Sequence, residues 1–94
     1  MIFDIDTARD ILRISGTDND NDIYALVAAI PPYLYETTGY RPDGVTGEFS
    51  PVATTAARCI LWQWYYGENS DVDKVQRVID CLLKALSAER AING

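Results

Sequence analysis

The sequence has no histidine and only two cysteines. Without histidine, the commonest general base and metal ligand is absent. Neither Cys59 nor Cys81 belongs to a CxxC motif or a metal-ligand spacing, so we expect both to be small buried hydrophobic residues and not a disulfide or redox pair. The sequence also contains no nucleophile elbow, Walker loop or dinucleotide-binding fingerprint. We therefore expect a protein that is not an enzyme and uses no cofactor and no metal.

Long apolar runs and a basic excess are also missing. No apolar stretch approaches the ~20 residues that span a bilayer, and the acidic N-terminal segment is unlike a signal peptide, so we expect a cytosolic chain with no membrane contact. The 8 basic residues against 14 acidic ones give a net charge of −6. Tight nucleic-acid binding needs a dense basic face, which this composition does not favour. An acidic surface could still line a path along which nucleic acid slides.

The length and composition predict one helical domain. The 94 residues, 48% of them hydrophobic, are enough for a single core and too few for two. No strand pattern of consequence occurs, and apolar residues recur at helical spacing. We expect an all-α fold over residues 1–94: a small bundle of four main helices with one long irregular loop, at about 40–50, between the second and third helices.

The first two helices have recognisable ends. Asp6 is the expected N-cap of a short helix over 7–14, which ends at Ser15-Gly16. A second helix ends at Gly39, and Pro31-Pro32 interrupts it. Either the helix kinks at the prolines or it restarts with Pro32 in its first turn. We favour a kink, because one apolar face continues through the prolines: Ile23, Leu26, Val27, Ile30 and Leu34.

The third and fourth helices follow the loop. Ser50 is the expected N-cap of the third helix, with Pro51 at its first position, and the helix is apolar nearly all round until Gly67. Asp71 is the expected N-cap of the fourth, amphipathic helix. Val78 widens the apolar stripe of this last helix, so we expect packing inside a bundle in preference to a coiled coil.

One acidic cluster has the first ligand positions of a calcium-binding EF-hand loop. Asp18, Asp20 and Asp22 are correctly spaced for it. The loop then needs a glycine where this chain has Ile23, and a bidentate glutamate where it has Ala29. The spacing therefore excludes this metal site, and we expect Asp20 or Asp22 to cap the second helix.

The aromatic residues are the best candidates for protein contacts. The run from Trp62 to Tyr66 cannot place every large side chain on one core, and tyrosine and tryptophan are enriched at interface hot spots. Two interpretations stay open: a core role alone, or core plus interface. If Trp62 is an exposed anchor, Trp62→Ala should impair assembly with little loss of stability. The candidate interface residues are Tyr24, Tyr35, Tyr40, Arg41, Phe49, Trp62, Tyr65 and Tyr66.

The order of motifs resembles a known family. A short helix ends in Leu12-Arg13-Ile14, an acidic turn follows at Asp18-Asn19-Asp20, and a long helix closes with the residues from Tyr35 to Arg41. After the loop, Ser50-Pro51 begins a buried helix that ends in Trp64-Tyr65-Tyr66-Gly67-Glu68-Asn69. This pattern is similar to the small head–tail connector proteins of tailed double-stranded DNA bacteriophages, also called adaptor or head-completion proteins. The prolines of the second helix depart from it.

The resemblance implies a structural virion protein. Its copies would form a ring, typically of about twelve, beneath the portal protein and extend the DNA channel toward a stopper or tail-completion protein. DNA would pass without specific binding, and the chain would reside at the head–tail interface of the virion after assembly in the host cytoplasm. The acidic cluster or the 40–50 loop would contribute to the lumen or to docking. The alternative is a cytosolic regulatory or antitoxin-like helical module that binds a single protein partner.

Overall fold

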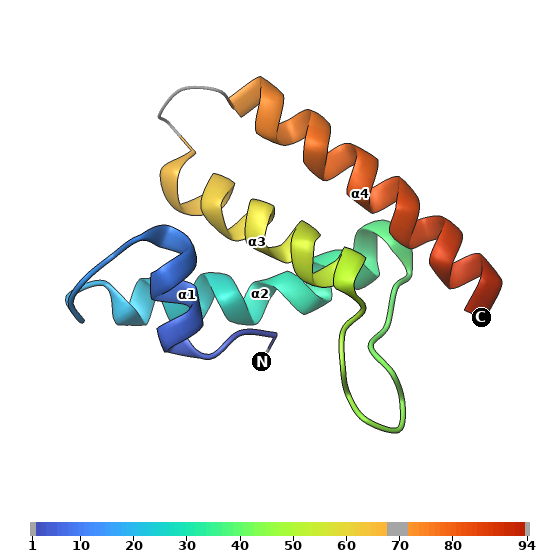
Figure 1. Cartoon of the computed structure of the whole chain (residues 1–94), viewed down its shortest axis with the longest axis horizontal. Helices are drawn as coiled ribbons and strands as arrows, with labels where there is room; N and C mark the ends of the chain where they lie inside the picture. The colour runs from blue at the N-terminus through green and yellow to red at the C-terminus, as the bar shows by residue number, and fades with distance from the viewer. Residues whose placement is uncertain (1, 68–71, 94) are drawn as a thin grey trace.

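The computed structural model describes residues 2–67 and 72–93, except for the side chains of 72, 73 and 89–93. The described residues form four helices and no strand: α1 (Ile5–Leu12), α2 (Asp20–Thr38), α3 (Pro51–Tyr66) and α4 (Val72–Asn93). Helix α3 lies between α2 and α4, and α1 packs against α2 and α3 (Figure 1). The molecule is flattened, with extents of 40 × 31 × 18 Å. The predicted all-α bundle with a loop between α2 and α3 is confirmed.

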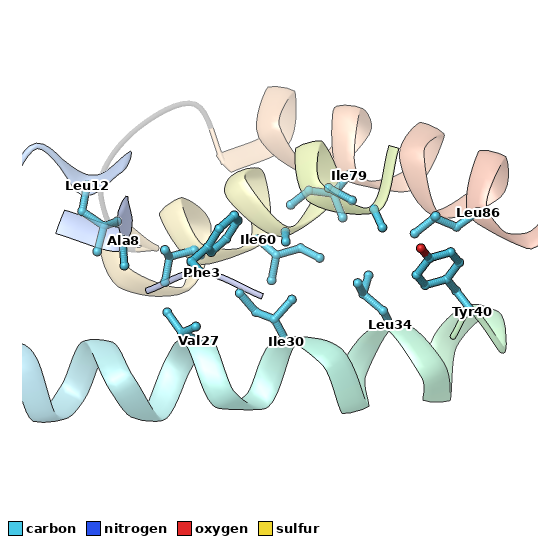
Figure 2. Close-up of a cluster of buried hydrophobic side chains, with 14 of the residues drawn as sticks. Phe3, Ala8, Leu12, Val27, Ile30, Leu34, Tyr40, Ile60, Ile79 and Leu86 are labelled. Carbon is cyan, nitrogen blue, oxygen red and sulfur yellow. The ribbon is translucent and has the colours of Figure 1, made fainter. Parts of the chain in front are cut away.

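The core lies where α2, α3 and α4 face one another. Figure 2 shows aliphatic side chains of α2 and α4 pointing toward α3 from opposite sides. The α3 side of this core contains three fully buried alanines, which let neighbouring helices approach closely. Burying each larger aliphatic side chain contributes roughly 1.5–3 kcal/mol. The largest fully buried residues are Leu12, Ile23, Val27, Ile30, Leu34, Ile60, Leu61, Ile79 and Leu86.

The ends of α1 differ from the sequence prediction. Asp4, not Asp6, is the N-cap: its carboxylate accepts a hydrogen bond from the Thr7 amide at 2.7 Å, and Asp6 lies in the first turn. The helix ends before Ser15-Gly16 because Arg13 adopts a left-handed conformation with φ 57°. This conformation lets the amides of residues 13 and 14 bond to carbonyls of the last turn.

Helix α2 continues through both prolines, so the alternative of a restart at Pro32 is wrong. The prolines remove the amides that would bond the carbonyls of residues 27 and 28. Ile30 and Leu34 on either side are fully buried, and their packing offsets this loss. Neither aspartate of the first turn is the N-cap; Asn19 occupies that position without a side-chain cap bond. Gly39 ends the helix with φ 77°, as predicted.

Helices α3 and α4 follow the predicted pattern with two corrections. Ser50 caps α3 by accepting a hydrogen bond from the Ala53 amide at 3.2 Å. The expected cap of α4, Asp71, lies outside the described residues. The predicted burial of two α4 residues is wrong: Val78 is 48% exposed, and Cys81 is also exposed. Both lie on the side of α4 that faces away from α3, whereas Cys59 on α3 is half-buried.

Candidate protein-interaction surfaces

The solvent side of α2 is apolar and uncharged along most of its length. No charged residue occurs between Asp22 and Glu36. The opposite side of the helix packs in the core, so the side chains on this side are exposed to solvent. Tyr24 is 42% exposed and Tyr35 is 43% exposed. We call this surface the α2 outer face; its residues, all exposed, are Tyr24, Ala25, Ala28, Ala29, Pro32 and Tyr35.

Arg41 joins the α2 outer face at its C-terminal end. Its guanidinium carbon lies 4.9 Å from the centre of the Tyr35 ring, and Nη2 donates a hydrogen bond to the Tyr35 hydroxyl at 2.9 Å. A cation–π contact at an exposed site contributes about 0.5–1 kcal/mol. Two of the residues predicted from sequence are therefore brought together.

A second exposed strip lies on α4. Ile79 and Leu86 point from α4 into the core (Figure 2), so residues half a turn away from them face solvent. This strip combines small apolar side chains with three basic ones. Sequence reasoning missed it because Val78 and Cys81 were both assigned to the bundle interior. We call it the α4 outer face; its exposed residues are Lys74, Arg77, Val78, Cys81, Lys84, Ala85 and Ala88.

The aromatic end of α3 holds the helices together. The Tyr66 hydroxyl donates to the Leu12 carbonyl at 2.6 Å, which ties α3 to the end of α1. The Tyr65 hydroxyl accepts a hydrogen bond from the Asn19 side chain at 2.9 Å. Trp62 is half-buried, with its ring centre 5.3 Å from that of Tyr66. These contacts support a packing role in the subunit, and a use of the remaining exposed edges in an interface stays a prediction.

Tyr40 and Phe49 close the base of the 40–50 loop. Tyr40 is only 7% exposed, and its hydroxyl accepts a hydrogen bond from the Ser50 amide at 2.8 Å. The ring of the half-buried Phe49 lies 6.3 Å from the Tyr40 ring, centre to centre. Tyr40 therefore has little surface left for a partner.

The loop itself projects from the bundle (Figure 1) and is ordered by its own hydrogen bonds. The Asp43 amide donates to the Glu48 carbonyl at 2.9 Å, and the Asp43 carboxylate accepts from the Val45 amide at 2.8 Å. Gly47, with φ 72°, donates its amide to the Asp43 carbonyl at 2.7 Å. Val45 at the tip is 95% exposed. The loop is thus a preformed projection with the almost fully exposed side chain of Val45 at its tip.

Only part of the acidic cluster is available to a partner. Arg9 forms ion pairs with Asp20 and, at 2.8 Å, with Asp6. The hydrogen bond to Asp20 raises the pKa of Arg9, and the pair links α1 to the start of α2. Asp18 and Asp22 are exposed on either side of it. In the part of the chain that the structure describes, no three acidic or cysteine side chains converge in a way that could hold a metal ion.

No protein-family model, curated protein or solved structure matches the chain. The surfaces above must therefore be interpreted from their own chemistry. None of the described helical segments is both apolar and long enough to traverse a bilayer. What the described residues offer is two unlike exposed helix faces and one projecting loop, all suited to contacts with proteins.

Proposed function

We propose that the chain is a head–tail connector (adaptor) subunit of a tailed bacteriophage. Its copies form a ring beneath the portal protein and extend the DNA channel toward a stopper or tail-completion protein. The motif order described above supports the family, and the α2 outer face carries the argument for assembly. An uncharged helix face with two exposed tyrosines is poorly suited to remain in water, and tyrosine is a favoured residue at protein interfaces.

The charge balance supports a role along a DNA path. With 14 acidic and 8 basic residues, the subunit offers few cations to phosphate groups, so DNA would pass without being held. The loop supplies a further contact element, and its projection from the bundle suits docking to the portal or to the next tail component.

The test is assembly on a portal. The chain is mixed with a candidate portal protein from the same genome, and the complexes are examined by electron microscopy and by light scattering after size-exclusion chromatography. We expect the images to show a ring of copies of this chain bound to the portal. The double variant Tyr24→Ser, Tyr35→Ser should lose this ring while the subunit stays folded, with only a modest fall in Tm from the lost contact between Arg41 and Tyr35. Arg58→Ala, at an exposed position of α3, should retain the ring.

The alternative function predicts a different particle. A regulatory or antitoxin-like module would stay monomeric or dimeric, would ignore the portal and would bind one unrelated protein. A chain that leaves the portal bare at saturating concentration would overturn the connector proposal.

A further inference from the structure

We propose that the α2 outer face of one copy docks on the α4 outer face of the next copy. This inference rests on the proposed function, because it specifies the contact that would build the ring. The occupant of each surface is a second copy of this chain, and the contact is between two unlike faces.

The positions of the two faces favour this contact. Val27, Ile30 and Leu34 point from α2 toward the middle of the molecule, and Ile79 and Leu86 point from α4 toward the same core (Figure 2). The outer faces therefore look away from each other, on opposite sides of the core that the two helices share. One copy consequently offers both halves of the contact at once, and each half is free to meet a different neighbour.

The two faces are complementary in charge. The α2 outer face begins beside the exposed carboxylates of Asp18 and Asp22. At its other end Glu36 is exposed, and Arg41 lies over Tyr35, which leaves this end close to neutral. The α2 side is therefore acidic near its N-terminal end.

The α4 outer face has the opposite sign. It presents three basic side chains in its described part: Lys74, Arg77 and Lys84. Among the α4 side chains that the structure describes, the one acid is Asp80, which accepts a hydrogen bond from Gln76 at 2.8 Å. Two copies of the α4 face would repel each other, and so would two acidic ends of α2, whereas the unlike pair attracts.

The apolar parts of both faces are also suited to a helix–helix contact. The alanines of both helices allow the helix axes to approach closely, while Tyr24 on one face and Val78 on the other supply larger side chains to be covered. Because the contact joins two different surfaces, it leaves a free copy of each surface at the ends of any chain of subunits. Such head-to-tail contacts close into rings when the rotation between neighbours permits.

Cys81 provides a direct test, because its exposed thiol lies on the α4 outer face. In a variant with Cys59→Ala, the substitution Ala28→Cys places a second thiol on the α2 outer face. A short bismaleimide should then join this thiol to Cys81 of a neighbour and yield a ladder of dimers, trimers and larger species. Adding Cys81→Ser leaves one thiol per chain, and that control should give dimers at most.

A charge exchange tests the same contact without cross-linking. Arg77→Glu with Lys84→Glu makes the α4 face acidic, and Asp18→Lys with Asp22→Lys makes the start of the α2 face basic. Each double variant alone should associate at least tenfold more weakly than the unmodified chain. An equimolar mixture should regain assembly with alternating subunits, because every contact then joins opposite charges.

The outcomes separate this inference from the proposed function. Rings on the portal with cross-linked products no larger than the control would overturn the interface and leave the connector function standing. A ladder and charge-exchange rescue with no portal binding would support the interface and overturn the connector function. If neither a ladder nor rescue is seen, with or without the portal, the interface is wrong.

Discussion

The Tyr66 hydroxyl donates a hydrogen bond to the carbonyl oxygen of Leu12 at 2.6 Å, across 54 positions of sequence. Leu12 is the last residue of α1, and the final carbonyls of a helix have no partner within the helix. The tyrosine at the end of α3 supplies that partner. A short helix of 8 residues, which would be marginal in isolation, is thereby fixed to the centre of the bundle.

Tyr66→Phe should therefore destabilise the subunit. The ring keeps its packing against Trp62 and Tyr65, while the Leu12 carbonyl loses its partner. We expect a loss of about 1 kcal/mol in the free energy of unfolding and a fall of roughly 4–8 °C in Tm. Urea unfolding and calorimetry measure both. Tyr65→Phe is the matched control, since it removes only a solvent-exposed bond from Asn19 and should have a smaller effect. Equal effects would contradict this role of Tyr66.

Asp4 should make α1 sensitive to acid. The hydrogen bond from the Thr7 amide lowers the pKa of Asp4 below its ordinary value. A carboxylate with a lowered pKa in the folded state stabilises the fold above its unfolded-state pKa, and this stabilisation is lost as the pH falls below about 4. Asp4→Asn keeps a side chain suited to capping but cannot titrate. Its stability relative to the unmodified chain should therefore be lowest at neutral pH and should recover as the pH falls below about 4.

Thermal melts from pH 7 to pH 2 provide the measurement for Asp4. Asp10→Asn is a suitable control. Asp10 is exposed, and among the described residues no group donates a hydrogen bond to its carboxylate, unlike that of Asp4. A constant difference in Tm between the Asp4→Asn variant and the unmodified chain at all pH values would refute the prediction.

Much of the fold followed from local signals. The Ser50-Pro51 start of α3 and the Gly39 end of α2 were correctly placed, because cap chemistry depends on a few adjacent residues. The start of α1 was misplaced because Asp4 and Asp6 are equally good caps in sequence. Only the structure distinguishes them: Asp4 has the extended backbone of an N-cap, with ψ 170°. The burial of Phe3 in the core fixes the chain just before α1 and so favours a helix start after Asp4.

The candidate surfaces were predictable only in part. Tyr24, Tyr35 and Arg41 were identified from composition, and they lie exposed. Tyr40 has the same residue type but is buried, because its position just after a helix end turns it inward. The sequence left open whether Trp62 is an exposed anchor or part of the core. Trp62 is half-buried with its ring against Tyr66, so Trp62→Ala should also cost stability. Periodicity identifies the apolar side of a helix but not which part of it a neighbour covers.

The two cysteines should differ strongly in reactivity. Cys81 is exposed on α4, whereas Cys59 is half-buried on α3, and burial raises the pKa of the Cys59 thiol. The thiolate is the reactive form, so Cys59 has both less thiolate and less access. With a maleimide at pH 7, Cys81 should be modified at least tenfold faster than Cys59, and denaturation in urea should remove the difference. Peptide mass spectrometry assigns each adduct, and Cys81→Ser should leave only the slow reaction.

The 40–50 loop should keep its shape through Asp43. The carboxylate of Asp43 accepts from the Val45 amide, and its backbone bonds to Gly47 and Glu48, so one residue organises both sides of the projection. Asp43→Ala removes the side-chain bond and leaves the bundle untouched. We expect hydrogen exchange at the Val45 amide to accelerate several-fold, with an unchanged Tm.

Asp43→Asn is the informative companion, because an amide oxygen can accept the same bond and should preserve slow exchange at Val45. If the loop serves as a preformed docking element, Asp43→Ala should also weaken assembly on the portal while Asp43→Asn does not, since an ordered loop loses less entropy on binding. Equal exchange rates in both variants would show that the backbone bonds alone hold the loop. An alanine variant that exchanges faster but assembles normally would show that the order of the loop serves the subunit and not the partner.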